Sequence, residues 1–142
     1  MRFVTFESEG LPKLGVRLGD EVVDLSKADP SLPNTLLAVL EADNGIFEEA
    51  KIAAESARER LSVDSIKFFP VIPRPTKIIC IGLNYAEHAA EGGHDRPNYP
   101  SFFMRGATSL TGHKQPIIRP KVSETLDYEA ELVAVIGKRS DR

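Results

Sequence analysis

Three prolines lie close together near the middle of the chain, and they divide the sequence into two parts. Pro70, Pro73 and Pro75 each fix φ and lack an amide donor, so neither a helix nor a central strand can run through them. We therefore predict a domain boundary near residue 70. A small α+β domain would occupy residues 1–70, and a second domain would begin at residue 71 and extend to residue 142.

The first part predicts a small β meander followed by helices. Residues 2–7 alternate as a strand does, and two further runs flank a turn at Gly19, which is typical of a β-hairpin. Asn34 is a suitable N-cap for a short helix over residues 35–40. Apolar residues at helical spacing then predict a longer helix over residues 46–61, whose apolar stripe is most simply core packing.

The second part reads as alternating strands and short helical segments. The predicted elements are a buried strand over 77–81, a short helix over 84–91 closed by a glycine pair, a strand over 102–104, loops over 106–125 and a strand over 128–136. Cys80 lies inside an apolar run, and we interpret it as a core residue rather than a nucleophile. The chain as a whole is therefore predicted to be α+β.

Composition excludes several classes of function. Hydrophobic residues make up 42% and charged residues 27%, which is ordinary for a globular protein. The net charge of -3 and a pI of about 5.6 argue against nucleic acid or a membrane surface as partner. A single cysteine rules out an internal disulfide, and no run is long and apolar enough for an export signal or a membrane span. We expect a cytoplasmic protein with small-molecule or protein partners.

Three acidic residues alternate along the last predicted strand. On a strand, Asp127, Glu129 and Glu131 would share one face, with neighbours about 6.6 Å apart along the backbone. Such carboxylates repel one another, and protonation, a basic partner or a metal ion could compensate them. Oxygen ligands without cysteine or a histidine pair favour Mg²⁺ or Mn²⁺ over zinc. The alternative is a solvated strand end with no ligand.

A histidine and a glutamate lie three residues apart in the predicted helix over 84–91. There, Glu91 could accept a proton from one nitrogen of His88 and orient the other, as in a pair that activates water. The following glycine pair would let the helix move as a lid. Arg105 could hold a substrate carboxylate in a bidentate manner. The alternatives are a surface helix with an ordinary ion pair, and a surface arginine.

Taken in order, three segments resemble the fumarylacetoacetate hydrolase family, in particular its bacterial 2-oxo acid and acylpyruvate hydrolases. The segments are residues 82–91, residues 100–105, and residues 126–132 followed by Gly137 and Lys138. The opening meander is similar to the small N-terminal domain of many bacterial members. The resemblance implies that this domain precedes the first part of a mixed, mainly β catalytic domain.

The resemblance also implies a role for each candidate residue. Glu129 and Glu131 match two metal-binding glutamates, and His88 with Glu91 matches the pair that activates water from a mobile lid. Arg105 stands where many members have a substrate-contacting lysine, and Tyr85 lies beside the pair. The implied enzyme uses Mg²⁺ or Mn²⁺ to stabilise an enolate while it cleaves a carbon–carbon bond of a 2-oxo acid or acylpyruvate-type β-diketone.

Other members of the family suggest alternatives and a context. Related enzymes decarboxylate, isomerise or hydrate oxo acids, and the resemblance also implies a homodimer and a place in the catabolism of aromatic compounds. Members have a third metal ligand, an aspartate further along than the glutamate pair, whereas the sequence ends at Arg142. We therefore expect the chain to be the first half of such an enzyme. The competing hypothesis is a truncated, non-catalytic module that associates through an unpaired sheet edge.

Overall fold

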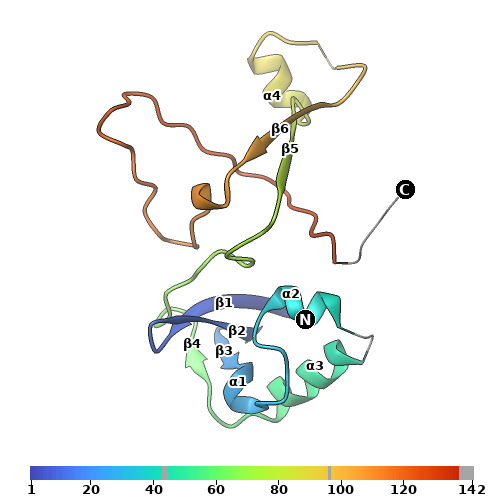
Figure 1. Cartoon of the computed structure of the whole chain (residues 1–142), viewed down its shortest axis with the longest axis vertical. Helices are drawn as coiled ribbons and strands as arrows, with labels where there is room; N and C mark the ends of the chain where they lie inside the picture. Colours follow the sequence, from blue (N-terminus) through green and yellow to red (C-terminus); the bar gives the residue numbers. More distant parts are fainter. Residues whose placement is uncertain (43–44, 96, 138–142) are drawn as a thin grey trace. The chain divides into compact units, whose positions relative to one another are not determined.

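The computed structural model describes residues 1–42, 45–95 and 97–137 and has two compact units. One unit joins Met1–Pro73 to the chain from Thr111 onward, and the other is Arg74–Leu110 (Figure 1). Strands and helices are mixed in the α+β manner that the sequence predicts. The division into domains at residue 70 stays a prediction.

The first unit is built on an antiparallel sheet of four strands. These are β1 (Arg2–Ser8), β2 (Leu11–Leu18), β3 (Glu21–Asp24) and the short β4 (Leu61–Ser62), in the order β1-β2-β3-β4. Glu9 and Gly10, both with positive φ, turn the chain between β1 and β2. The predicted hairpin turn at Gly19 is confirmed, with φ of 63°.

Three helices accompany this sheet. They are α1 (Leu25–Ala28), α2 (Leu36–Glu41) and α3 (Ile46–Ser56). The N-cap of α2 is Thr35 rather than Asn34, because the Thr35 hydroxyl accepts a hydrogen bond from the Ala38 amide at 3.2 Å. No helix within the described ranges has the length and the apolar run needed to cross a bilayer.

The long helix ends earlier than the sequence predicts. We expected it to continue to Leu61, but Ala57 is extended, with ψ of 134°, and α3 ends at Ser56. The chain then supplies Leu61 as the partner of Val22 in the sheet. Pairing of backbone groups at the sheet edge therefore takes precedence over the apolar periodicity of the helix.

The core of the first unit lies between one face of the sheet and the helices. Its members come from β2, β3, the three helices and one loop, and they are Leu14, Val16, Val23, Leu25, Leu32, Val39, Ala50 and Ala54. On the opposite face of the sheet, the Phe6 ring lies directly over Gly15. A Cβ added at Gly15 would stand 2.9 Å from Phe6 Cε1 and 2.8 Å from Val22 Cγ1. Glycine is therefore required for this packing.

Replacing Gly15 with alanine will destabilise the first unit by about 1–3 kcal/mol. The added methyl group would also stand 2.9 Å from the Val23 carbonyl oxygen, which belongs to the backbone and cannot rotate away. Thermal unfolding followed by circular dichroism measures the effect. Gly45→Ala is the matched control, because its Cβ would meet only the flexible Glu49 carboxylate at 3.6 Å. Equal melting temperatures for the two variants would contradict the packing.

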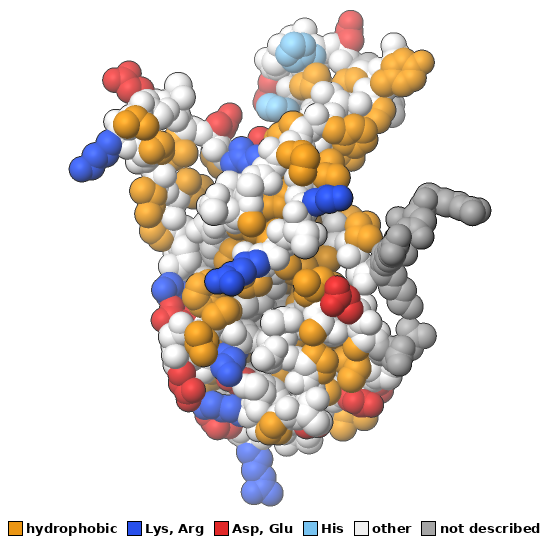
Figure 2. All heavy atoms as spheres, viewed as in Figure 1, with side chains coloured by type: hydrophobic (Ala, Val, Ile, Leu, Met, Phe, Trp, Pro, Cys, Tyr) orange, Lys and Arg blue, Asp and Glu red, His pale blue; other side chains and the backbone are white. Residues whose placement is uncertain are grey.

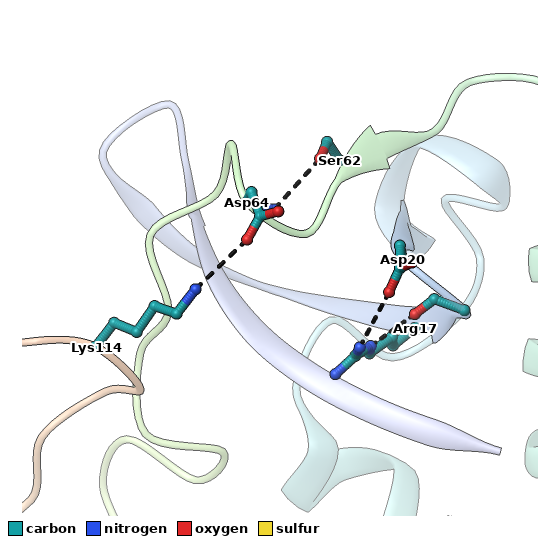
Figure 3. Close-up of polar contacts among 6 residues, drawn as sticks. Arg17, Asp20, Ser62, Asp64 and Lys114 are labelled. Carbon is teal, nitrogen blue, oxygen red and sulfur yellow. Dashed lines mark hydrogen bonds and ion pairs between the residues drawn. The ribbon is translucent and has the colours of Figure 1, made fainter.

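Residues 112–114 of the loop-rich segment pack against the chain that follows β4 in the first unit. A Cβ at Gly112 would collide with the Phe68 carbonyl, and the His113 ring meets the Phe68 ring edge-on at 5.4 Å. Lys114 pairs with Asp64 at 3.4 Å, and the Asp64 amide donates to the Ser62 hydroxyl at 3.3 Å (Figure 3). These contacts tie residues 112–114 to the segment that follows β4.

The second unit is a ribbon of two antiparallel strands with a short helix between them. Strand β5 (Ile78–Gly82) pairs with β6 (Ser101–Arg105), α4 (Ala86–Glu91) lies between them in sequence, and a 3-10 turn (Ala107–Ser109) follows. The prediction of a buried strand is wrong in one respect, since Ile79 is 60% exposed and Cys80 is only half-buried. A ribbon of two strands covers neither of its own faces. Apolar side chains accordingly reach the surface in Figure 2.

The prediction of a strand over residues 128–136 is also wrong. These residues have no regular secondary structure, and Leu132 and Ile136 are 93% and 76% exposed. A strand exists only where its amides and carbonyls pair with a neighbour. Within the described ranges no strand pairs with this segment, and β propensity alone does not make it a strand.

Candidate functional site

The helix α4 places the predicted His88–Glu91 pair and is bounded by two turns. Tyr85 is its extended N-cap, with φ of -101°, and the Tyr85 carbonyl accepts the Ala89 amide at 3.0 Å. At the other end the Gly93 amide donates to Ala90 O and the His94 amide donates to Ala89 O. With φ of 71° at Gly93, these bonds form a Schellman motif. The predicted closure of the helix by the glycine pair is confirmed.

His88 and Glu91 occupy neighbouring positions on α4, three residues apart, and both side chains are exposed. Residues at this spacing share one face of a helix. Within the described ranges no hydrogen bond joins these two side chains, so the predicted contact between Glu91 and the imidazole is not formed. Figure 2 shows histidine side chains at the surface around α4. The exposure of His88 makes its imidazole accessible to a bound molecule.

Two further candidates lie on the same unit as this pair. Tyr85, as the N-cap of α4, is 43% exposed. Arg105 is the last residue of β6, is half-buried and pairs across the ribbon with Ile78. The ribbon fixes the backbone at Arg105, and the cap fixes it at Tyr85. The second unit therefore carries a base, an acid, a phenol and a guanidinium on 21 consecutive residues, 85–105.

The two candidate metal-binding glutamates lie in the first unit. Glu129 and Glu131 are exposed and belong to the irregular segment described above. The Asp127 carboxylate accepts the Tyr128 amide at 2.9 Å and is thereby turned toward its own backbone. Among the residues that the structure describes, no three acidic, histidine or cysteine side chains gather as a metal site. The donor type suits a hard cation, but two carboxylates supply only part of a ligand set.

One feature next to α4 was not expected from the sequence. Leu83, the residue that follows β5, has φ of 54° and so lies in the left-handed region. The sequence did indicate a tight turn here, because a predicted strand is followed within three residues by a predicted helix. Gly82 and Asn84 are the residues in this link that commonly form turns. Leucine between them gave no reason to expect the left-handed residue there.

Comparisons with known proteins identify one family and several relatives. Residues 77–142 match the family described as fumarylacetoacetate (FAA) hydrolase C-terminal. The whole chain is 39% identical over 143 residues to oxaloacetate tautomerase fahd2, mitochondrial, of Xenopus laevis, which covers 98% of the chain and 45% of that protein. The corresponding rat protein, Fahd2a of Rattus norvegicus, is 35% identical with similar coverage. The chain thus spans about half the length of the curated relatives it matches.

Solved structures agree on the architecture. The chain resembles the crystal structure of maleylpyruvate hydrolase from Sphingobium sp. SYK-6 in complex with manganese(II) ion and pyruvate. The TM-score is 0.58 at 28% identity, over 86% of this chain and 43% of that one. A structure titled "a putative HpcE protein" from Mycobacterium smegmatis gives a TM-score of 0.59 at 23% identity, over 82% of this chain and 40% of that one. The second likeness concerns the fold alone.

Proposed function

We propose, since this chain belongs to the fumarylacetoacetate hydrolase family, that it supplies part of the active site of a divalent-metal-dependent enzyme acting on a 2-oxo acid. His88 would be its proton-transfer base, with Glu91 as the partner that orients the imidazole. Glu129 and Glu131 would be two of its metal ligands. The observation that carries the proposal is a histidine–glutamate pair held on one helix between two defined turns.

The cation would be Mg²⁺ or Mn²⁺, held by carboxylate oxygens of Glu129 and Glu131 and by donors outside the described residues. The maleylpyruvate hydrolase structure is in complex with manganese(II) ion and pyruvate, which supports a metal ion and a 2-oxo acid as ligands. When bound, such an ion acts as a Lewis acid that stabilises negative charge on an oxygen of the substrate.

Residues of the second unit would handle the substrate and the proton. One nitrogen of His88 would accept a proton, while the Glu91 carboxylate accepts a hydrogen bond from the other and stabilises the imidazolium. The Arg105 guanidinium would hold a carboxylate of the substrate through two N–H donors. Tyr85, beside the pair, would contribute a phenol that contacts the substrate.

Two reactions fit these roles. In carbon–carbon bond hydrolysis of an acylpyruvate, His88 would take a proton from the attacking water. This reaction is supported by the maleylpyruvate hydrolase likeness. In keto–enol isomerisation of an oxo acid, His88 would deliver a proton to the carbon as the enol oxygen loses its proton to solvent, or carry out the reverse transfer. The isomerisation is favoured by the higher identity, over nearly the whole chain, to proteins named oxaloacetate tautomerase.

Assays of the protein at its natural length separate the two reactions. We expect Mn²⁺-dependent acceleration of oxaloacetate enol-to-keto conversion, lost after chelation and restored by added Mn²⁺ or Mg²⁺. The enol absorbance reports the conversion, and the protein-free buffer with the same metal is the control. Cleavage of an acylpyruvate without tautomerase activity would instead assign the hydrolase reaction. Rates unaffected by chelation in both assays would reject the metal-dependent enzyme.

The cellular compartment and the oligomeric state of the protein are proposals independent of its reaction. The single cysteine leads us to expect the cytoplasm, although the curated relatives carry "mitochondrial" in their names. The homodimer is likewise an expectation. Cell fractionation and sedimentation of the natural protein test these two proposals.

A further inference from the structure

The link between β5 and α4 contains a backbone conformation that leucine rarely adopts. Leu83 has φ of 54°, where its Cβ crowds the following carbonyl oxygen. Only two other non-glycine residues in the described ranges share a positive φ, and these are Glu9 and Lys114. Glu9 lies in the two-residue β1–β2 hairpin, where the turn itself favours that conformation. Leu83 lies in no hairpin, so another constraint must hold it.

The constraint comes from the elements on each side. Gly82, the last residue of β5, pairs with Ser101 of β6. Tyr85 is already the N-cap of α4. Only Leu83 and Asn84 remain to turn the chain from the ribbon into the helix. A strained residue persists where its surroundings over-determine it, and here one end of the link belongs to the paired ribbon and the other begins the helix.

The left-handed conformation occurs at Leu83 although the next residue, Asn84, could adopt it at a lower energetic cost. Asn84 tolerates the left-handed region better than leucine does, yet it does not have a positive φ. Moving the turn by one residue would relieve the strain and would change the direction in which α4 leaves β5. Because His88 and Glu91 lie on that helix, their position would change as well.

We propose that Leu83 is a positioning residue for the His88–Glu91 pair. Its left-handed backbone directs the chain from the end of β5 into α4 and thereby sets where the imidazole stands relative to the ribbon. The proposal rests on the proposed function of His88 for its catalytic consequence. The role belongs to the backbone at position 83, since the side chain is only half-buried.

Three substitutions at position 83 distinguish backbone from side chain. Valine is β-branched and disfavours a positive φ, whereas glycine and asparagine accept it. In the protein at its natural length, Leu83→Val should lower kcat for the 2-oxo acid by about 10- to 100-fold, because a small displacement of a catalytic group has effects of this size. KM should change little, since the pair acts in the chemical step. Leu83→Gly and Leu83→Asn should keep most of the wild-type kcat.

Leu110→Val is the matched control, because Leu110 belongs to the same unit and has an ordinary φ of -79°. It should leave kcat unchanged. Wild-type kcat in Leu83→Val would overturn the proposal, and so would an equal loss in Leu83→Gly, which would assign the effect to the leucine side chain. Deuterium exchange over residues 84–94 gives a second readout, with faster exchange expected only in Leu83→Val. If the wild-type protein turns over no 2-oxo acid, the proposed function fails, and this exchange pattern alone decides whether Leu83 positions α4.

Discussion

Replacing Glu131 with glutamine will weaken Mn²⁺ binding to the protein at its natural length by at least about 100-fold. Glutamine keeps the size of the side chain but removes the negative charge that a hard cation requires. Loss of a residue that only supports a metal ligand costs about 10- to 100-fold in affinity or activity, so loss of a ligand itself should cost at least as much. Titration of the metal-free protein with Mn²⁺, followed by electron paramagnetic resonance, measures the free ion.

The control for this substitution is Glu124→Gln. Glu124 lies seven residues before Glu131 in the same unit and is also exposed, so its substitution removes the same charge from the same part of the chain. We expect its Mn²⁺ affinity to match that of the wild type. If Glu131→Gln binds Mn²⁺ as tightly as Glu124→Gln does, Glu131 is a solvated acid and the metal-ligand proposal is wrong.

Replacing His88 with alanine should lower kcat by about 10²- to 10⁴-fold, the usual contribution of a positioned general base. His88 is the only histidine on α4, whose other side chains are alanines and glutamates, so the substitution removes the one imidazole of that helix. Mn²⁺ affinity should not change, because the proposed ligands are the two glutamates. Steady-state kinetics with the 2-oxo acid, combined with the same metal titration, separates proton transfer from metal binding.

His94→Ala is the matched control for His88→Ala. His94 is exposed on the same unit, and its role in the Schellman motif is played by its backbone amide, which alanine retains. The control should turn over substrate at the wild-type rate. Equal losses in both variants would indicate a general disturbance of the unit, and unchanged turnover in His88→Ala would remove it from the proposed mechanism.

The elements that local patterns specify were predictable. The alternation of β1, the turn at Gly19, the helical stripe of α3 and the glycine-closed α4 are all present. Each depends on interactions within a few residues: a turn with positive φ, a cap, or an amphipathic period. The identity of the candidate site residues also came from sequence, because their types and spacing carry the resemblance to the family, and their roles stay proposals.

The sequence-based predictions were wrong where the structure of a segment depends on partners that are distant in sequence. Apolar spacing favoured helix as far as Leu61, but pairing of Leu61 with Val22 made that residue part of β4. The β-branched run over residues 128–136 favoured a strand, but no described strand pairs with it. The left-handed conformation of Leu83 likewise follows from the fixed ends of β5 and α4 rather than from leucine itself. Side-chain pattern and composition thus specify which segments prefer helix, strand or turn, and which residues can bind a metal ion or transfer a proton. Tertiary contacts decide where those segments end, because backbone hydrogen bonds between distant residues outweigh local preference.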